Sequence, residues 1–108
     1  MILNLLSAIL LTLSITPQQA WAPTDLLATI RVDRAVLGEV CLEMTSTADT
    51  SILLFRSSCE GLDGRVRQIR WRSIPPGEYR LRATFRGGQE RAVTSWTPLI
   101  VRAPIGAE

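Results

Sequence analysis

The clearest pattern in the chain is a two-residue alternation between apolar and polar side chains from position 79 to position 86. Successive side chains of a β-strand point to opposite faces of a sheet, so this alternation predicts a strand with one buried and one exposed face. The apolar positions are Tyr79, Leu81, Ala83 and Phe85, and the polar positions are Arg80, Arg82, Thr84 and Arg86.

A rigid corner precedes this strand. Pro76 fixes φ at the second position of a turn, and Gly77 supplies the positive φ that the next position of a type II turn requires. We therefore expect Pro76, Gly77 and Tyr79 to form a structural corner that feeds the strand.

Shorter patterns of the same kind predict strands, and no convincing helix, along the rest of the chain. The run at residues 51–56 lacks clean alternation, which suits a strand buried on both faces, although its period also fits a short helix. In residues 38–44, Val40, Leu42 and Met44 face inward, so Cys41 lies on the outer side. The expected strands cover residues 27–33, 38–44, 51–56, 65–72, 79–86, 89–96 and 99–102.

Gly87-Gly88 is a good two-residue hairpin turn. It would pair Phe85 with Glu90, Ala83 with Ala92, Leu81 with Thr94 and Tyr79 with Trp96. A tight turn at Pro76-Gly77 would instead place arginines on the apolar face, so that connection is expected to cross between two sheets. These elements together predict an all-β fold, an immunoglobulin-like or transthyretin-like sandwich of about seven short antiparallel strands.

The first 22 residues are predicted to be a signal peptide. An uncharged apolar run from Leu5 to Ile15 is followed by Ala20-Trp21-Ala22, the small-x-small pattern of a signal-peptidase site. The alternative is an uncleaved anchor, but the run is shorter than the ~20 residues that span a bilayer. We expect a β-sandwich domain at residues 23–103, a flexible tail at 104–108, no transmembrane segment after processing, and a periplasmic or secreted location.

The chain contains two cysteines, Cys41 and Cys59. In an exported protein such a pair is most simply one disulfide, and closing this loop would stabilise a small domain by ~3 kcal/mol. The rival interpretation is a redox or nucleophilic thiol. The sequence has no Cys-x-x-Cys motif and no histidine to act as a base, which argues against it.

Charge is unevenly distributed along the chain. Residues 23–64 carry three arginines against seven acidic residues, whereas residues 65–102 carry nine arginines against Glu78 and Glu90. The net charge of +2 therefore hides an acidic first half and a basic second half.

Few features of the sequence support an enzymatic function. The chain has no histidine, no lysine, no nucleophile elbow, no metal-ligand cluster and no phosphate-binding glycine loop. Glu39 and Glu43 lie too far apart along a strand to form an obvious acid–base pair. We expect a protein that is not an enzyme, with no catalytic residues, no metal and no cofactor.

The arginines are the best candidates for a binding site. The predicted hairpin gathers Arg80, Arg82, Arg86 and Arg91 on its outer face, and Arg70 and Arg72 lie on the neighbouring basic strand. Like charges that face each other across strands are destabilising unless something anionic covers them. The partner would be another exported protein or an anionic envelope component, and export excludes nucleic acid. The alternative is a solvated face whose arginines pair with the acidic residues of the first half.

Two resemblances bear on the fold and on the function. The stretch Ile74-Pro75-Pro76-Gly77-Glu78-Tyr79-Arg80-Leu81, preceded by Asp63-Gly64-Arg65, resembles the corner of carboxypeptidase-regulatory-like (transthyretin-like) domains, and is similar to the tyrosine corner of immunoglobulin-like sandwiches. Immunoglobulin domains would have a cysteine where this chain has Leu81. Gly87-Gly88-Gln89 and Trp96 resemble small periplasmic immunoglobulin-like proteins of curli assembly, which hold amyloid subunits soluble, although Cys41 lacks their cysteine-x-cysteine pair.

The sequence thus predicts an exported, non-enzymatic binding or assembly module that docks an acidic or extended partner through an arginine-rich β face. Two alternatives stay open. One is a periplasmic chaperone or inhibitor of another protein, for example of amyloid fibre subunits, as the curli resemblance implies. The other is a structural or adhesin subunit.

Overall fold

The protein is all-β, as the sequence predicts. The computed structural model describes residues 9–17, 19–22, 24–47 and 54–103, and no helix occurs among them. Seven strands form one sheet in the order β1-β3-β5-β7-β2, with β4 paired to β3 and β6 paired to β5. Their bounds are β1 Leu11–Thr16, β2 Gln19–Trp21, β3 Thr24–Ser46, β4 Leu54–Ile74, β5 Gly77–Gly87, β6 Glu90–Val93 and β7 Thr97–Arg102.

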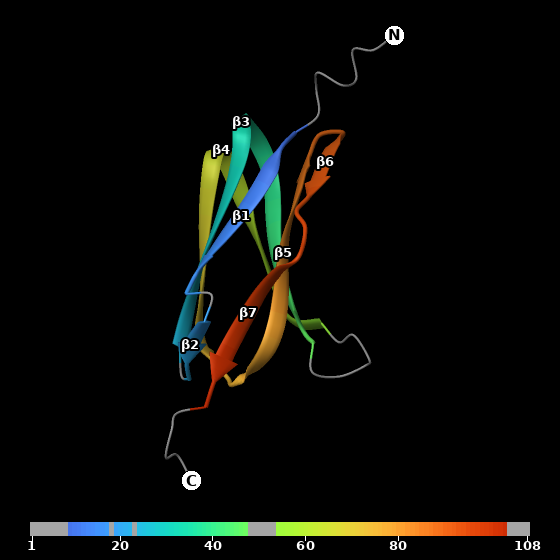
Figure 1. Cartoon of the computed structure of the whole chain (residues 1–108). Helices are drawn as coiled ribbons and strands as arrows, with labels where there is room; N and C mark the ends of the chain where they lie inside the picture. The colour runs from blue at the N-terminus through green and yellow to red at the C-terminus, as the bar shows by residue number, and fades with distance from the viewer. Residues whose placement is uncertain (1–8, 18, 23, 48–53, 104–108) are drawn as a thin grey trace.

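Strands β3 and β4 are much longer than the sequence pattern suggests, with 23 and 21 residues. Each joins two of the predicted strands, because their antiparallel ladder continues through an irregularity instead of ending in a loop. Arg31 pairs with Val66 and Val36 with Gly64, so β3 takes up more residues than β4 across this bend. Extra residues on one strand bend it and increase its twist. Figure 1 shows β3 turning over at one end of the molecule and running back.

The bend folds the long β3–β4 pair into two facing layers. The indole nitrogen of Trp71 donates a hydrogen bond to Ser58 Oγ at 2.8 Å, although the two residues are 13 positions apart on the same strand. The guanidinium of Arg56 also lies over the Trp71 ring, 5.3 Å from its centre. The two halves of β4 therefore face each other, and the single sheet curls into a half-barrel.

The core fills the inside of this curl. Alternate residues of β3 and β5 point inward and are almost completely buried, as the period-2 pattern predicts. They are Ala28, Ile30, Val40, Leu42 and Met44 of β3, with Tyr79, Leu81, Ala83 and Phe85 of β5. Leu99 and Val101 of β7 complete this wall, so β5 is central to the packing.

The corner before β5 is closed by its tyrosine. The Tyr79 hydroxyl donates to the carbonyl oxygen of Pro75 at 2.8 Å and approaches that of Pro76 at 3.3 Å. The φ of Gly77 is positive, at 157°, and more extended than the type II turn requires. The tyrosine side chain packs so closely on Gly77 that a Cβ there would lie 2.8 Å from the hydroxyl oxygen.

The β5–β6 hairpin is present, but its turn was placed one residue too early. The loop is Gly88-Gln89, so Gly87 pairs with Glu90 and Phe85 pairs with Ala92 rather than with Glu90. Gly88 has the positive φ of 59°, whereas Gly87 is a strand residue that packs against the Phe85 ring. Trp96 accordingly does not face Tyr79, which pairs with Leu99 of β7.

Strands β1 and β2 lie within the segment predicted to be a signal peptide. β1 pairs antiparallel with residues 27–32 of β3, and β2 pairs parallel with residues 100–102 of β7. Leu11, Ile15 and Ala22 are buried in this arrangement. Processing after Ala22 stays a prediction. Among the described residues, no helix has the length and apolar character needed to cross a membrane.

Candidate functional site

The outer face of the curled sheet, opposite the core, carries a site built from rows of side chains that cross the strands. Cys59 of β4 pairs with Cys41 of β3, Cys41 also pairs with Thr84 of β5, and Thr84 pairs with Val93 of β6. Directly opposite residues point to the same face. This central row is therefore weakly polar: a disulfide, a threonine and an exposed valine.

Charged rows flank the central row on both sides. On one side, Glu39 of β3 pairs with Arg86 of β5, which pairs with Arg91 of β6. On the other side, Glu43 of β3 lies opposite Arg82 of β5. Each charged row lies two residues from the central row along its strand, so the two are separated by roughly 13 Å. That leaves room for an extended chain to lie between them.

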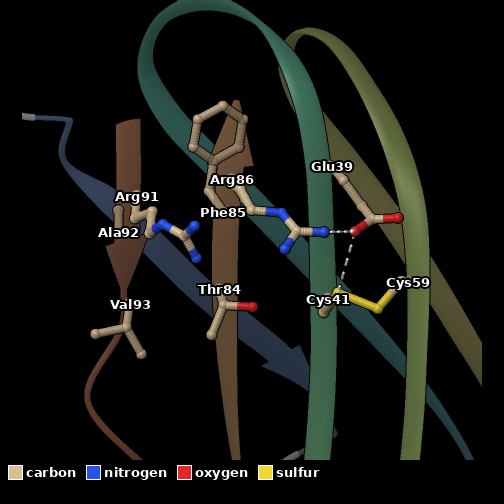
Figure 2. Close-up of a pocket in the computed structure, with 9 residues that line it drawn as sticks. All are labelled: Glu39, Cys41, Cys59, Thr84, Phe85, Arg86, Arg91, Ala92 and Val93. Atoms are coloured by element: carbon tan, nitrogen blue, oxygen red, sulfur yellow. Dashed lines mark hydrogen bonds and ion pairs between the residues drawn. A yellow bond between two sulfur atoms is a disulfide. The ribbon is translucent and has the colours of Figure 1, made fainter. Parts of the chain in front are cut away.

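A groove of about 560 Å³ follows the central row and the row of Glu39, Arg86 and Arg91. Figure 2 shows the guanidinium of Arg91 projecting from β6 towards β5 above Thr84, while that of Arg86 points towards Glu39. Phe85, Ala92 and Val93 also line the groove, although Phe85 is buried in the core and only Val93 is an exposed apolar side chain. The groove therefore offers two cationic groups beside a floor of the disulfide, Thr84 and Val93.

The charges in the groove do not balance. Glu39 and Arg86 form an ion pair at 3.5 Å, with side chains 47% and 62% exposed. Arg91 lies directly opposite Arg86 and is exposed, and no ion pair joins it to any residue that the structure describes. This row therefore has two guanidinium groups and one carboxylate, Glu39, which pairs with Arg86. Like charges in direct cross-strand register repel each other, so a further anion at this place would be stabilising.

Arg80 and Arg82 lie farther along β5 and are engaged within the protein. Their guanidinium carbons stand 4.4 and 4.5 Å from the centre of the Trp96 ring. Arg82 also pairs with Glu43, and Arg80 Nε donates to Thr45 Oγ1 at 3.3 Å. The ion pair between Arg82 and Glu43 agrees with the alternative given by the sequence, in which arginines of the second half of the chain pair with acidic residues of its first half. Arg80 and Arg82 thus hold the Trp96 ring against the outer face of the sheet, beside the groove.

Arg70 and Arg72 lie in a different part of the molecule. They belong to the second half of β4, which pairs with the first half of β3, whereas the groove lies on the second half of β3. Both side chains are exposed. The structure therefore brings Arg86 and Arg91 together at the groove, places Arg80 and Arg82 beside it, and separates Arg70 and Arg72 from it.

The predicted disulfide between Cys41 and Cys59 is formed and provides part of the groove floor. Glu39 lies beside the two sulfur atoms, and the three residues together have a spacing that could hold a metal ion. Because both sulfurs are bonded to each other, neither is a thiolate, which is the form that binds metals. The site as it stands is suited to polar and ionic contacts.

Sequence reasoning missed Glu39 and Val93 as parts of this site. Val93 is apolar, which favours a core position, yet it is 59% exposed. The hairpin carries the missing signal: with Gly87-Gly88 or Gly88-Gln89 as the loop, Val93 lies opposite an outward residue of β5, and the structure places it opposite Thr84. Glu39 is brought to Arg86 by long-range pairing, which no local pattern shows.

No protein-family model and no curated protein matches this chain. The fold is similar to one chain of a solved structure that reports the structural basis of T cell specificity and activation by the bacterial superantigen toxic shock syndrome toxin-1. The TM-score is 0.57 at 13% sequence identity, and the match covers 84% of this chain and 98% of that chain. At this identity the likeness concerns the fold alone, and it agrees with the all-β architecture.

Proposed function

We propose that the protein is an exported, non-enzymatic binding or assembly module that docks an acidic, extended partner in the groove between β3, β5 and β6. The observation that carries the proposal is the directly opposed pair Arg86 and Arg91, which has one carboxylate, Glu39, for two guanidinium groups. A carboxylate of the partner would relieve the repulsion between the two arginines. Arginine also binds carboxylates with two parallel hydrogen bonds, which fixes the partner's orientation.

The groove's shape and floor support an extended partner. The disulfide, Thr84 and Val93 form a row between the two charged rows, so a chain lying across the strands would contact sulfur, methyl and hydroxyl groups. Trp96, held by Arg80 and Arg82, forms an aromatic rim beside it. Buried aromatic and arginine contacts contribute much of the affinity in protein interfaces.

A chaperone or inhibitor of another exported protein is the second candidate. The resemblance of Gly87-Gly88-Gln89 and Trp96 to curli assembly proteins favours it, and amyloid subunits are extended, strand-forming chains. The same groove would serve this function if the partner presented acidic residues. A structural or adhesin subunit is the third candidate and would need no anion-binding groove.

The decisive experiment compares two arginines, Arg91 and Arg70, which are both exposed but lie on different parts of the sheet. Arg91→Glu changes the unpaired charge at the groove, and Arg70→Glu, on the other half of the sheet, is the matched control. The probe is a fluorescein-labelled peptide of alternating glutamate and serine, followed by fluorescence anisotropy at low and high salt. Arg91→Glu should weaken binding by about tenfold at low salt, with a smaller loss at high salt because ions screen exposed charges.

The melting temperature of both variants should stay close to that of the unmodified protein, because exposed charges contribute only ~0 to 1 kcal/mol to stability. Equal losses from Arg70→Glu and Arg91→Glu would mean that binding follows net charge and that the groove is not a site. Unchanged binding in Arg91→Glu would contradict the proposal outright.

A further inference from the structure

We propose that processing after Ala22 opens a strand-accepting site along the edge of β3, and that its ligand is an extended segment of a partner protein with apolar side chains at every second position. The proposal rests on the signal-peptidase site predicted from the sequence. It does not depend on the groove. The observation behind it is that β1, which belongs to the segment to be removed, occupies this edge as a fully registered strand.

The pairing and burial of β1 show which side chains this edge of β3 accommodates. All six residues of β1 pair in register, from Leu11 with Val32 to Thr16 with Leu27. Leu11 and Ile15 point into the core and are only 7% and 4% exposed, and Leu13 packs against the core as well. β1 also lies close to β5, so its apolar face is covered from two sides. Removing β1 would uncover both a backbone edge and an apolar slot.

Processing would also remove β2 and so uncover three residues of β7, but the longer opening is this edge of β3. The other edge is paired with β4 along nearly the whole strand, and the second half of the same edge is paired with β5. The slot has a defined end at Asp33, whose backbone nitrogen donates to the Leu10 oxygen at 3.1 Å and whose Oδ1 accepts from the Leu10 nitrogen at 3.2 Å. An unpaired strand edge of this kind is a template for an added strand.

The residues of β3 specify the chemistry of the ligand. Inward positions lie opposite Val32, Ile30 and Ala28, so the ligand needs apolar side chains there. Outward positions lie opposite Arg31 and Thr29, where β1 has Thr12 and Ser14. Arg31 is exposed, and no ion pair within the described residues involves it. The preferred ligand is therefore apolar, acidic, apolar, hydroxyl and apolar in succession.

Charge complementarity favours a foreign strand over a second copy of the chain. Two copies pairing through this edge about Ile30 would place Arg31 of one opposite Thr29 of the other, which leaves the arginine without an acid. The six residues that β1 vacates, 27–32, include no acid, so a copy could place Asp25 or Asp33 opposite Arg31 only in registers that run beyond them. A partner strand with Asp or Glu opposite Arg31 gains this ion pair within the vacated edge. Self-association is therefore an outcome that the test must detect.

The test uses the full chain, with a protease recognition sequence inserted between Ala22 and Pro23. After folding and cleavage, a fluorescein-labelled peptide with the sequence of residues 9–17 is added and its anisotropy followed. The cleaved protein should bind the peptide by exchange, whereas the uncut chain should not, because its own β1 is tethered beside the slot. Ile15→Asp in the peptide should weaken binding by at least about tenfold, since it places a charge in the core.

A charge swap gives the sharpest result. Thr12→Glu in the peptide should tighten binding to the cleaved protein about threefold or more at low salt. Arg31→Glu in the protein should reverse that preference, so that Thr12→Arg becomes the better peptide. Arg91→Glu in the protein should leave binding of this peptide unchanged, which separates the strand site from the groove of the proposed function.

Several results would overturn the proposal. These are equal binding by cut and uncut protein, no exchange within a day, or equal binding of the Ile15→Asp peptide. A cleaved protein that unfolds by circular dichroism, or that sediments as a dimer and ignores the peptide, would also overturn it. So would an intact mass of the exported protein showing that residues 11–16 are retained, because the slot would then stay filled.

Discussion

The two halves of β3 have the same alternation of side chains but different neighbours. The second half, from Glu39 to Ser46, is paired with β4 on one edge and β5 on the other. It carries the disulfide and two cross-strand ion pairs. The first half is paired with β4 and with β1, a strand from the predicted leader. One half is therefore fixed by the domain itself, and the other depends on a segment that processing would remove.

This difference separates two kinds of binding surface on one strand. The second half has no open edge, so it can bind a partner only through side chains on its outer face, where the groove lies. The first half, once β1 is removed, can bind a partner through its backbone. The four predictions that follow test how far the two halves differ, from the largest expected effect to the smallest.

Removing the disulfide should weaken the second half most. Replacing Cys41 and Cys59 together by serine should lower the free energy of unfolding by ~3 kcal/mol, because the unfolded chain gains the entropy of an unclosed loop. Chemical denaturation measures the loss. In native-state hydrogen exchange, removing the disulfide should accelerate the exchange of the amides of Val40–Met44 more than that of the amides of Ala28–Val32. Equal acceleration in both halves of β3 would contradict this expectation. An unchanged free energy of unfolding would mean that the disulfide does not stabilise the fold.

The point where the two halves meet should tolerate no side chain at Gly38. A Cβ on Gly38 would lie 2.5 Å from the Arg86 carbonyl oxygen and 2.7 Å from the Phe85 ring. Gly38→Ala should therefore destabilise the protein by ~1 to 3 kcal/mol, the usual cost of overpacking. Gly61→Ala is the control, because the nearest atom to its Cβ is 4.0 Å away. If both variants unfold at the same denaturant concentration, Phe85 does not pack on Gly38 as described.

Tyr79 ties the corner to the end of the second half, where it pairs with Ser46. Tyr79→Phe should lower the free energy of unfolding by ~1 kcal/mol, because it leaves the Pro75 carbonyl without its hydroxyl partner. Val101→Ala on β7 serves as a comparison of pure packing loss at a buried position. A neutral Tyr79→Phe variant would show that the hydroxyl contributes nothing to the corner.

The same residue gives the protein a pH dependence in alkali. Burial raises the pKa of Tyr79 above its ordinary value of 10.0, because the neutral phenol is favoured in the core. The stability that it contributes is complete below pH 10 and is lost as the pH rises through the raised pKa of the folded state. As Tyr79 is the single tyrosine of the chain, tyrosinate absorbance reports it directly. A midpoint at or below 10 would contradict the burial.

Local pattern was sufficient for the core of β5 and for the disulfide. The alternation from Tyr79 to Phe85 depends only on the chain's own period, and the structure buries each of its odd positions. The cysteines needed no geometric argument, because a chain with two cysteines has one way to pair them within itself. The hairpin was placed one residue early because both Gly87 and Gly88 suit a turn, and only the packing of Phe85 decides between them.

What the sequence by itself determined is the all-β class, the inward and outward faces of its strands, the cysteine pair and the opposite charges of the two halves of the chain. What the tertiary structure decided is which of those charges meet. The bend in β3 sends its two halves to different neighbours, so Arg82 and Arg86 find acids, Arg91 faces another arginine, and Arg70 and Arg72 lie elsewhere. Pairing between strands distant in the chain depends on register and packing, which are set by contacts over the whole molecule and by no local period.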